Sequence, residues 1–437
     1  MPQGNKDWYG AMTLAVFGGA PVNREPWPRW PRLGERGPEY LSQVLESDRW
    51  SVSGPRAHNP TMNELACARF AKFCGAKFAF AVDHGSSALV AALLALEVGP
   101  GDEVIIPGLT WVACASAVLR VNGVPVPVDI SPSTLCMDPD AIEAAITERT
   151  RAIMVVHLYS SMADLDRILD IARRRDLVVI EDAAQSHGAE WRGVRAGASG
   201  TIGAFSFHQG KPMATGEGGM VVTSSERLAE KLEQIRADGR RFGHGPIGRQ
   251  HLVDVADTQG FNFCMSELHC ALLMDALDRV EGENQLRANN AAAIDRYLFE
   301  GSAWRPVEAY PPNNKRTYYH YGVRFDEAVF EGCSAELVCA ALEAELGYHI
   351  HTSYPPMNAF PLFAADRYSS VRSLPWSDAL DLRGCPLPNA EEQHRRLVLL
   401  HHPILMSDES RLGAVADAFD KVARFADDLR SKSTRSG

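Results

Sequence analysis

The chain has 437 residues, of which 46% are hydrophobic and 23% are charged, and its formal net charge is −11 at pH 7. This size and composition predict a globular protein of two or three domains, whose core is large enough to need neither disulfides nor a structural metal. The acidic residues are spread along the chain, so the charge disfavours binding to nucleic acid and to anionic membranes.

The cysteines and the N-terminus bear on cellular location. There are nine cysteines, an odd number, and none forms a Cys-x-x-Cys pair, which indicates reduced thiols in a cytoplasmic protein and no metal site. The apolar run 11–20 is short, contains Gly18-Gly19 and leads into Pro21, so it predicts an arm on the protein or on a partner subunit rather than a secretion signal. No apolar stretch is long enough to cross a bilayer.

Helices and short apolar strands alternate from about residue 60. Helices are predicted at 61–74, 88–97, 111–122, 138–145 and 162–175. Seven strands are predicted at 78–82, 103–107, 125–129, 152–157, 177–181, 204–208 and 219–223. Continuous apolar strands that alternate with helices predict an α/β fold with a mainly parallel seven-stranded sheet, covered by helices on both faces.

The pattern changes after about residue 275. A long helix at 266–297 is followed by a strand at 317–325, a helix at 334–346, a strand at 397–405 and an amphipathic helix at 411–429. We therefore expect a large domain at 1–275, which includes the N-terminal arm, and a smaller α+β domain at 276–437.

Polar residues cluster at the ends of the predicted parallel strands, which is where such sheets bind ligands. Gly85-Ser86-Ser87 follows the first strand and opens a helix. Backbone N–H groups and hydroxyls at a helix N-terminus can bind an anion such as phosphate. The two serines can equally cap the helix, and the two roles are compatible.

Lys211 lies in a loop that has glycines after the lysine, the reverse of the order in a Walker loop. A lysine that forms imines must be reachable and able to lose its proton, and the small residues beside Lys211 leave room for a cofactor. The alternative is a surface lysine before a turn.

Asp182 ends the fifth strand, and pyridoxal 5'-phosphate (PLP) enzymes need a carboxylate beside the pyridine nitrogen. Gln185 could then reach the ring's phenolic oxygen, and Trp111, after another strand, could stack on the ring. Asp182 could instead cap a turn, and Trp111 could be part of the core.

Together these segments resemble the DegT/DnrJ/EryC1/StrS family of fold-type I PLP aminotransferases. The similarity lies in Gly85 to Leu89, Pro107 to Trp111, Glu181 to Gln185, Phe205 to Phe207 with Lys211, and Gly216 to Gly219. Gly260-Phe261-Asn262 also fits the family pattern.

The resemblance implies a role for each matching residue. Lys211 would form the imine with PLP and carry the proton between Cα and C4', while Asp182 would pair with the pyridine nitrogen. Gln185 would bind the ring hydroxyl and Trp111 would stack on the ring. The phosphate would be held by Gly85, Ser86, Ser87 and Ser206. Asn262 would reach the phosphate of a neighbouring subunit, which implies a homodimer with its active sites at the interface.

Other segments resemble the branch that aminates scyllo-inosose and 2-deoxy-scyllo-inosose with L-glutamine: 17–21, 50–54, 156–160, 236–240, 316–319 and 400–402. This implies transfer of an amino group from L-glutamine or L-glutamate to a keto-cyclitol or keto-sugar in aminocyclitol antibiotic biosynthesis. The chain departs from that branch in two places: Asp83-His84 stands where a small or hydroxyl residue is usual, and Ser87 stands where many relatives have alanine.

Three residues are candidates for substrate contact. Arg240 and Arg316 could bind the donor's carboxylate through the planar guanidinium, although each could equally be a surface or structural arginine. His208 lies three residues before Lys211 and could touch substrate or simply pack.

Three rival functions remain at this stage. Another PLP reaction on the same scaffold is one, either a nucleotide keto-sugar aminotransferase or a 3-amino-5-hydroxybenzoate-type synthase; sugar dehydratases of the family carry histidine at the Lys211 position. A nucleotide-dependent enzyme is disfavoured because no Gly-x-Gly-x-x-Gly or Walker pattern follows a strand. A non-catalytic binding module would be expected to have lost Lys211 or Asp182.

Overall fold

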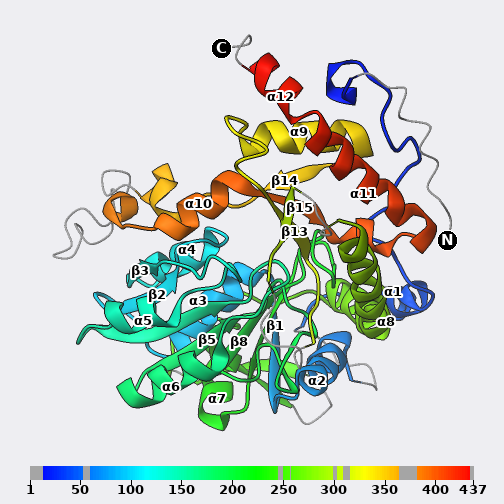
Figure 1. The fold of residues 1–437 in the computed structure, drawn as a ribbon. Helices are drawn as coiled ribbons and strands as arrows, with labels where there is room; N and C mark the ends of the chain where they lie inside the picture. The colour runs from blue at the N-terminus through cyan, green and yellow to red at the C-terminus, as the bar shows by residue number, and fades with distance from the viewer. Residues whose placement is uncertain are drawn as a thin grey trace.

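The computed structural model describes residues 13–52, 60–244, 250–255, 257–298, 303–308, 315–363 and 381–433. Its centre is a seven-stranded sheet (Figure 1) in the order β1-β9-β8-β5-β4-β2-β3. The strands are β1 (Phe78–Val82), β2 (Glu103–Pro107), β3 (Val124–Val128), β4 (Thr150–Val156), β5 (Val178–Asp182), β8 (Ile202–Ser206) and β9 (Gly219–Thr223). Only β9 runs antiparallel to its neighbours β1 and β8, so the predicted mainly parallel α/β sheet is confirmed.

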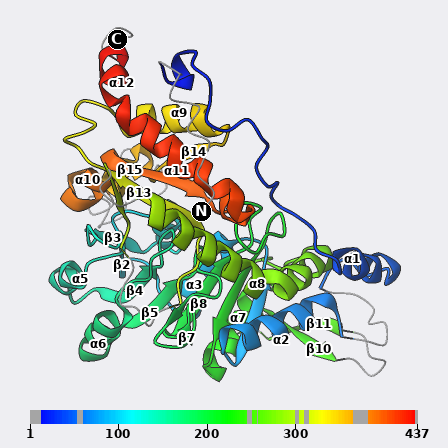
Figure 2. The same cartoon turned by 45° about the vertical axis from the view of Figure 1, so that its right-hand side comes forward.

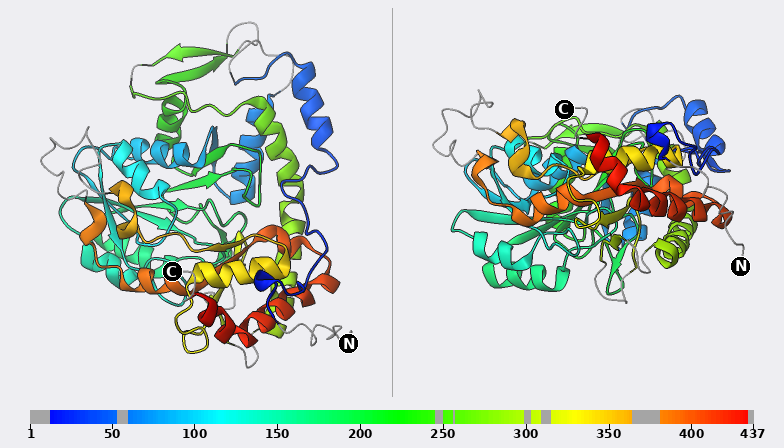
Figure 3. Two further views of the ribbon diagram at one scale, coloured as in Figure 1. Left: turned by 90° about the horizontal axis from the view of Figure 1, so that it is seen from above. Right: turned by 45° about the horizontal axis from the view of Figure 1, so that its top comes forward.

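Helices cover this sheet: α2 (Met62–Cys74), α3 (Gly85–Ala95), α4 (Ala113–Arg120), α5 (Pro139–Ala145), α6 (Leu165–Arg175) and α7 (Glu226–Ile235). Helix α3 is apolar on nearly every side, and it packs on α4, α7, β8 and β9. Helix α7 is an element that the sequence did not predict, as are two hairpins: β6 (Glu190–Trp191) with β7 (Val194–Arg195), and β10 (Arg240–His244) with β11 (Gln250–Asp254). The second hairpin projects from one end of the molecule (Figure 3).

Above the large sheet in Figure 1 lies a second, antiparallel sheet in the order β12-β13-β15-β14. Its strands are β12 (Trp304–Pro306), β13 (His320–Phe325), β14 (Ile350–Thr352) and β15 (Leu397–His401). The accompanying helices are α9 (Ala335–Leu346), α10 (Pro388–Arg396), α11 (Glu409–Arg424) and α12 (Ala426–Ser433). Short 3-10 helices occur at Ala15–Phe17, Met357–Ala359, Pro361–Phe363, Leu382–Gly384 and His402–Met406.

Helix α8 (Glu267–Leu298) joins the two sheets and is 32 residues long. The described residues form two buried hydrophobic clusters, and α8 contributes Leu273 and Val280 to one and Ile294 and Leu298 to the other. The predicted division of the chain after residue 275 falls inside this helix, and it stays a prediction.

The N-terminal arm packs on the chain's own second sheet region, one of the two placements that the sequence left open. Leu14 and Trp27 belong to the second cluster. A buried ion pair anchors the arm: Glu345 on α9 accepts hydrogen bonds from the backbone N–H groups of Ala15 and Val22, and Lys421 donates to the carbonyl of Ala20. The arm then descends to α1 (Gly37–Glu46), as Figure 2 shows.

None of the helices in the described ranges combines the length and the apolar character that crossing a bilayer requires. All nine cysteines are free thiols.

Candidate active site

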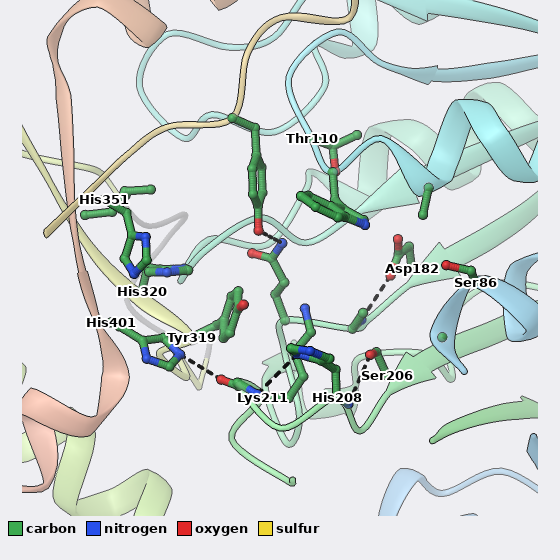
Figure 4. Close-up of a pocket in the computed structure, with 18 of the residues that line it drawn as sticks. Ser86, Thr110, Asp182, Ser206, His208, Lys211, Tyr319, His320, His351 and His401 are labelled. Carbon is green, nitrogen blue, oxygen red and sulfur yellow. Dashed lines mark hydrogen bonds between the residues drawn. The ribbon is translucent and has the colours of Figure 1, made fainter. Parts of the chain in front are cut away.

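A cavity of about 720 Å³ opens where strands β1, β2, β5 and β8 end. Eight of the residues that the sequence singled out line it: Gly85, Ser86, Trp111, Asp182, Gln185, Ser206, His208 and Lys211. Figure 4 places Lys211 and Tyr319 in its middle, with Asp182 and Ser86 on one side and three histidines on the other. The strand ends therefore bring together residues that are up to 126 positions apart, from Gly85 to Lys211.

The Lys211 amine is buried and lies 4.2 Å above the centre of the Tyr319 ring. Burial lowers the pKa of Lys211 from its ordinary 10.5 to about 8, while the charge of Asp182 acts in the opposite direction. At pH 8 about half of this amine is therefore neutral, and the neutral amine is the nucleophile that forms an imine.

The backbone on both sides of the Lys211 Cα is fixed by side chains from distant segments. His401 and His402 each direct Nε2 at the Gly210 carbonyl, at 2.7 and 3.2 Å, and Trp30 of the arm donates to the Lys211 carbonyl at 3.1 Å. Arg287 donates to Nδ1 of His402, so Nε2 of that ring carries the hydrogen and is the donor. The lysine thus projects from a backbone whose two carbonyls are held in place.

Asp182 ends β5 and is 8% exposed. Its Oδ1 accepts a hydrogen bond from the Ala184 N–H at 3.0 Å, and the Cys114 thiol lies 3.5 Å from Oδ2. Burial raises the pKa of Asp182, and the Lys211 ammonium opposes that shift. A carboxylate in this setting favours a nearby cationic partner such as a protonated ring nitrogen.

Gln185 has a fixed amide orientation. Its Oε1 accepts from the Tyr159 N–H at 2.8 Å, and its Nε2 donates to the Tyr354 hydroxyl at 3.4 Å. The side chain therefore presents an N–H donor, rather than an acceptor, to the cavity.

The start of α3 lies at the end of β8, beside the cavity. His84 at the N-cap makes no side-chain hydrogen bond to the first turn, so the helix N-terminus has no protein cap. A Cβ at Gly85 would lie 2.5 Å from the Cβ of Ser206, so only glycine lets α3 and the end of β8 come this close. Ser86 lines this corner of the cavity, whereas Ser87 is buried and does not.

Besides Ser87, three predicted residues lie outside the cavity of this chain. Arg240 pairs with Asp238 at 3.0 Å, and Arg316 donates to the Ser160 and Val307 carbonyls. The contact of these arginines with a substrate carboxylate stays a prediction. Asn262 is exposed. The predicted contact with a neighbouring subunit requires such exposure in the single chain.

The cavity also contains residues that the sequence analysis did not single out as site residues, namely Tyr319, His320, His351, Tyr354 and His401. All lie on a strand of the second sheet or within two residues of one. The adjacent pair His401-His402 was visible as a motif, but its placement depends on how β15 pairs with β13. Among the described residues, no group of three metal-ligating side chains is arranged to hold a metal ion.

The sequence profile of the DegT/DnrJ/EryC1/StrS aminotransferase family matches residues 31–398. The chain belongs to this family. This aminotransferase is 42% identical, over 94% of its length and 96% of the relative's, to the L-glutamine:2-deoxy-scyllo-inosose aminotransferase of Streptomyces kanamyceticus. It is 41% identical to the L-glutamine:scyllo-inosose aminotransferase of Streptomyces griseus, over 94% of its own chain and 97% of that relative.

Among solved structures, the aminotransferase resembles 3-amino-5-hydroxybenzoic acid synthase, with a TM-score of 0.78, 28% identity, and coverage of 92% of this chain and 100% of the other. It is a PLP-dependent enzyme, as the family is. The cavity fits that cofactor: it offers a lysine with a lowered pKa, a buried carboxylate, and an uncapped helix N-terminus beside a close approach that a Cβ would block.

Proposed function

We propose that this aminotransferase transfers an amino group from L-glutamine or L-glutamate to a keto-cyclitol or keto-sugar such as scyllo-inosose, in aminocyclitol antibiotic biosynthesis. The observation that carries the proposal is 42% identity over nearly the full length to a relative that acts on 2-deoxy-scyllo-inosose. The cavity agrees with it, because about 720 Å³ can hold PLP and a six-membered ring together.

PLP, when bound, supplies an electron sink that makes the donor's Cα–H acidic. Lys211 would hold the cofactor through an imine, and the donor's amine would replace it there and leave the lysine amine free. The free amine would then accept the proton from the donor's Cα. A pKa of about 8 suits both tasks, because the amine can accept and release a proton near neutral pH. Asp182 holds a proton on the pyridine nitrogen.

The other cavity residues position the ring. Gln185 would donate its Nε2–H to the ring oxygen, in the orientation that Tyr159 fixes. Trp111, which is 53% exposed, would stack on the ring. The start of α3, with Gly85 and Ser86, would bind the phosphate together with the Ser206 hydroxyl. Ser87 supports this turn from its buried position.

We further propose an obligatory homodimer in the cytoplasm. Asn262 is exposed and lies away from its own cavity, so it is free to reach the phosphate bound by a second subunit. No arginine lines the cavity among the described residues, so the donor's carboxylate requires a cation from elsewhere, and a partner subunit can supply one.

The test follows absorbance of the PLP-loaded enzyme. L-glutamine should bleach the visible cofactor band, and scyllo-inosose should restore it, because the two substrates react in alternation at one site. Lys211→Ala should show neither change. Bleaching by glutamine with no recovery on any keto-cyclitol would contradict the substrate, and a Lys211→Ala enzyme with normal turnover would contradict the role of the lysine.

A second candidate is an aromatising reaction, because the fold matches that of 3-amino-5-hydroxybenzoic acid synthase at 28% identity. A panel of keto-cyclitols, nucleotide keto-sugars and an aminocyclohexenone acid separates the two. Recovery of the band when a ketone is added to the amine form would support amino transfer. Conversion of the aminocyclohexenone acid to an aromatic product by the PLP-loaded enzyme, without loss of the band, would favour this candidate.

A further inference from the structure

Three histidines of the second sheet face the cavity, and we call His320, His351 and His401 the imidazole wall. His320 and His401 are direct cross-strand partners on β13 and β15, and His351 on β14 lies opposite Leu399. Side chains two residues apart on a strand share a face, so Leu399 and His401 place all three rings on the same side of the sheet. The ring centres are 5.2 to 6.1 Å apart.

The wall keeps hydrogen-bonding capacity for a ligand. Nδ1 of His320 is buried and has no hydrogen-bond partner. The residue is 5% exposed and lines the cavity. His401 donates Nε2–H to the Gly210 carbonyl, which leaves its Nδ1 as an acceptor. The ring nitrogens of His351 have no hydrogen bond to another described residue. The buried, unpaired nitrogen of His320, in a residue that lines the cavity, points to a polar ligand there.

These rings are uncharged near neutral pH. Burial lowers the pKa of His401 to about 4, and it lowers the pKa of His320 well below 6.5 and that of His351 in the same direction. A neutral imidazole offers one donor and one acceptor, as a hydroxyl group does, whereas a carboxylate needs donors only. The wall therefore matches an uncharged polyol better than the carboxylate of an amino acid.

We propose that the imidazole wall binds ring hydroxyls of the keto substrate and thereby selects a polyhydroxylated, uncharged ring. This inference rests on the proposed function and assigns the acceptor's hydroxyls to the wall, across the cavity from Asp182 and Ser86 (Figure 4). The donor amino acid, which occupies the same cavity in the other half-reaction, makes no essential contact with these rings.

The test uses His351→Phe in the PLP-loaded enzyme, because phenylalanine keeps a flat ring and removes both hydrogen-bonding nitrogens. The probe is scyllo-inositol, which lacks the keto group, with its affinity measured by calorimetry. We expect binding to weaken about tenfold and KM for the keto-cyclitol to rise by a similar factor. The rate of the glutamine half-reaction should stay within about twofold, because the donor does not need the wall. His351→Asn, which keeps a donor and an acceptor, should recover part of the affinity.

The matched control is His349→Phe. His349 lies two residues away and outside the cavity, where it pairs with Glu343 at 2.8 Å and its ring lies 4.3 Å from that of His351. Phenylalanine keeps this ring contact, so the change should leave polyol binding intact. The proposal is overturned if wild-type enzyme does not bind scyllo-inositol, if His351→Phe binds it normally, or if the glutamine half-reaction falls as much as polyol affinity. If polyol binding depends on His351 but no keto-cyclitol is aminated, the proposed function is wrong, whereas the binding of hydroxyl groups by the imidazole wall is supported.

Discussion

Lys211 is a buried amine whose pKa is set by two opposed effects, namely burial, which lowers it to about 8, and the charge of Asp182, which raises it. Below about pH 8 the amine is protonated, and as the pH rises through this value it becomes the neutral, reactive form. In cofactor-free protein, acetylation of Lys211 by acetic anhydride should therefore increase with pH, with a midpoint near 8 by mass spectrometry.

Asp182→Asn is the informative comparison for that titration. Removing the carboxylate removes its attraction for the ammonium, so the midpoint should move to lower pH than in the wild type. A wild-type midpoint near the ordinary value of 10.5 would show that the amine is solvated rather than buried.

At the scale of single elements, the contact between the start of α3 and the end of β8 decides whether the phosphate cradle can form. Gly85→Ala would place a Cβ 2.5 Å from the Ser206 Cβ and force the two elements apart. Overpacking of this kind costs about 1–3 kcal/mol, so PLP affinity should fall about tenfold or more in a fluorescence titration of cofactor-free protein. Gly99→Ala is the control, because a Cβ there meets nothing within 4 Å. Equal losses in both variants would contradict this role for Gly85.

Local sequence patterns predicted the site residues at the ends of the parallel strands, but they did not predict the site residues that the second sheet contributes. Asp182 and Ser206 each follow a buried apolar run, so the parallel sheet alone brings them to one edge. The imidazole wall depends instead on the register between β13 and β15, whose paired residues His320 and His401 are 81 positions apart. A shift of β15 by one residue would turn His401 to the other face of the sheet, and the sequence carries no local signal for that register.

At the scale of the whole molecule, the arm is held by the Glu345–Lys421 pair, whose side chains are both fully buried at 2.9 Å. Glu345→Gln leaves the Lys421 charge without a partner in the interior, which costs about 3–5 kcal/mol. We expect a clear drop in the urea midpoint of unfolding, and replacing Lys421 by methionine in the same protein should recover part of it.

Glu343→Gln provides the comparison on the same helix. Glu343 pairs with His349 on the surface, and exposed pairs contribute about 1 kcal/mol or less. Equal urea midpoints for Glu345→Gln and Glu343→Gln would show that the buried ion pair does not hold the arm in place.

Helix α8 has a further consequence for how the protein unfolds. Its first half belongs to the hydrophobic cluster that contains the large sheet, and its second half belongs to the cluster that contains the second sheet. Helix formation is cooperative, so melting one half of α8 destabilises the other half. The two regions should therefore lose structure in one cooperative transition, and a fragment that ends at residue 275 would cut α8 and leave both cores incomplete.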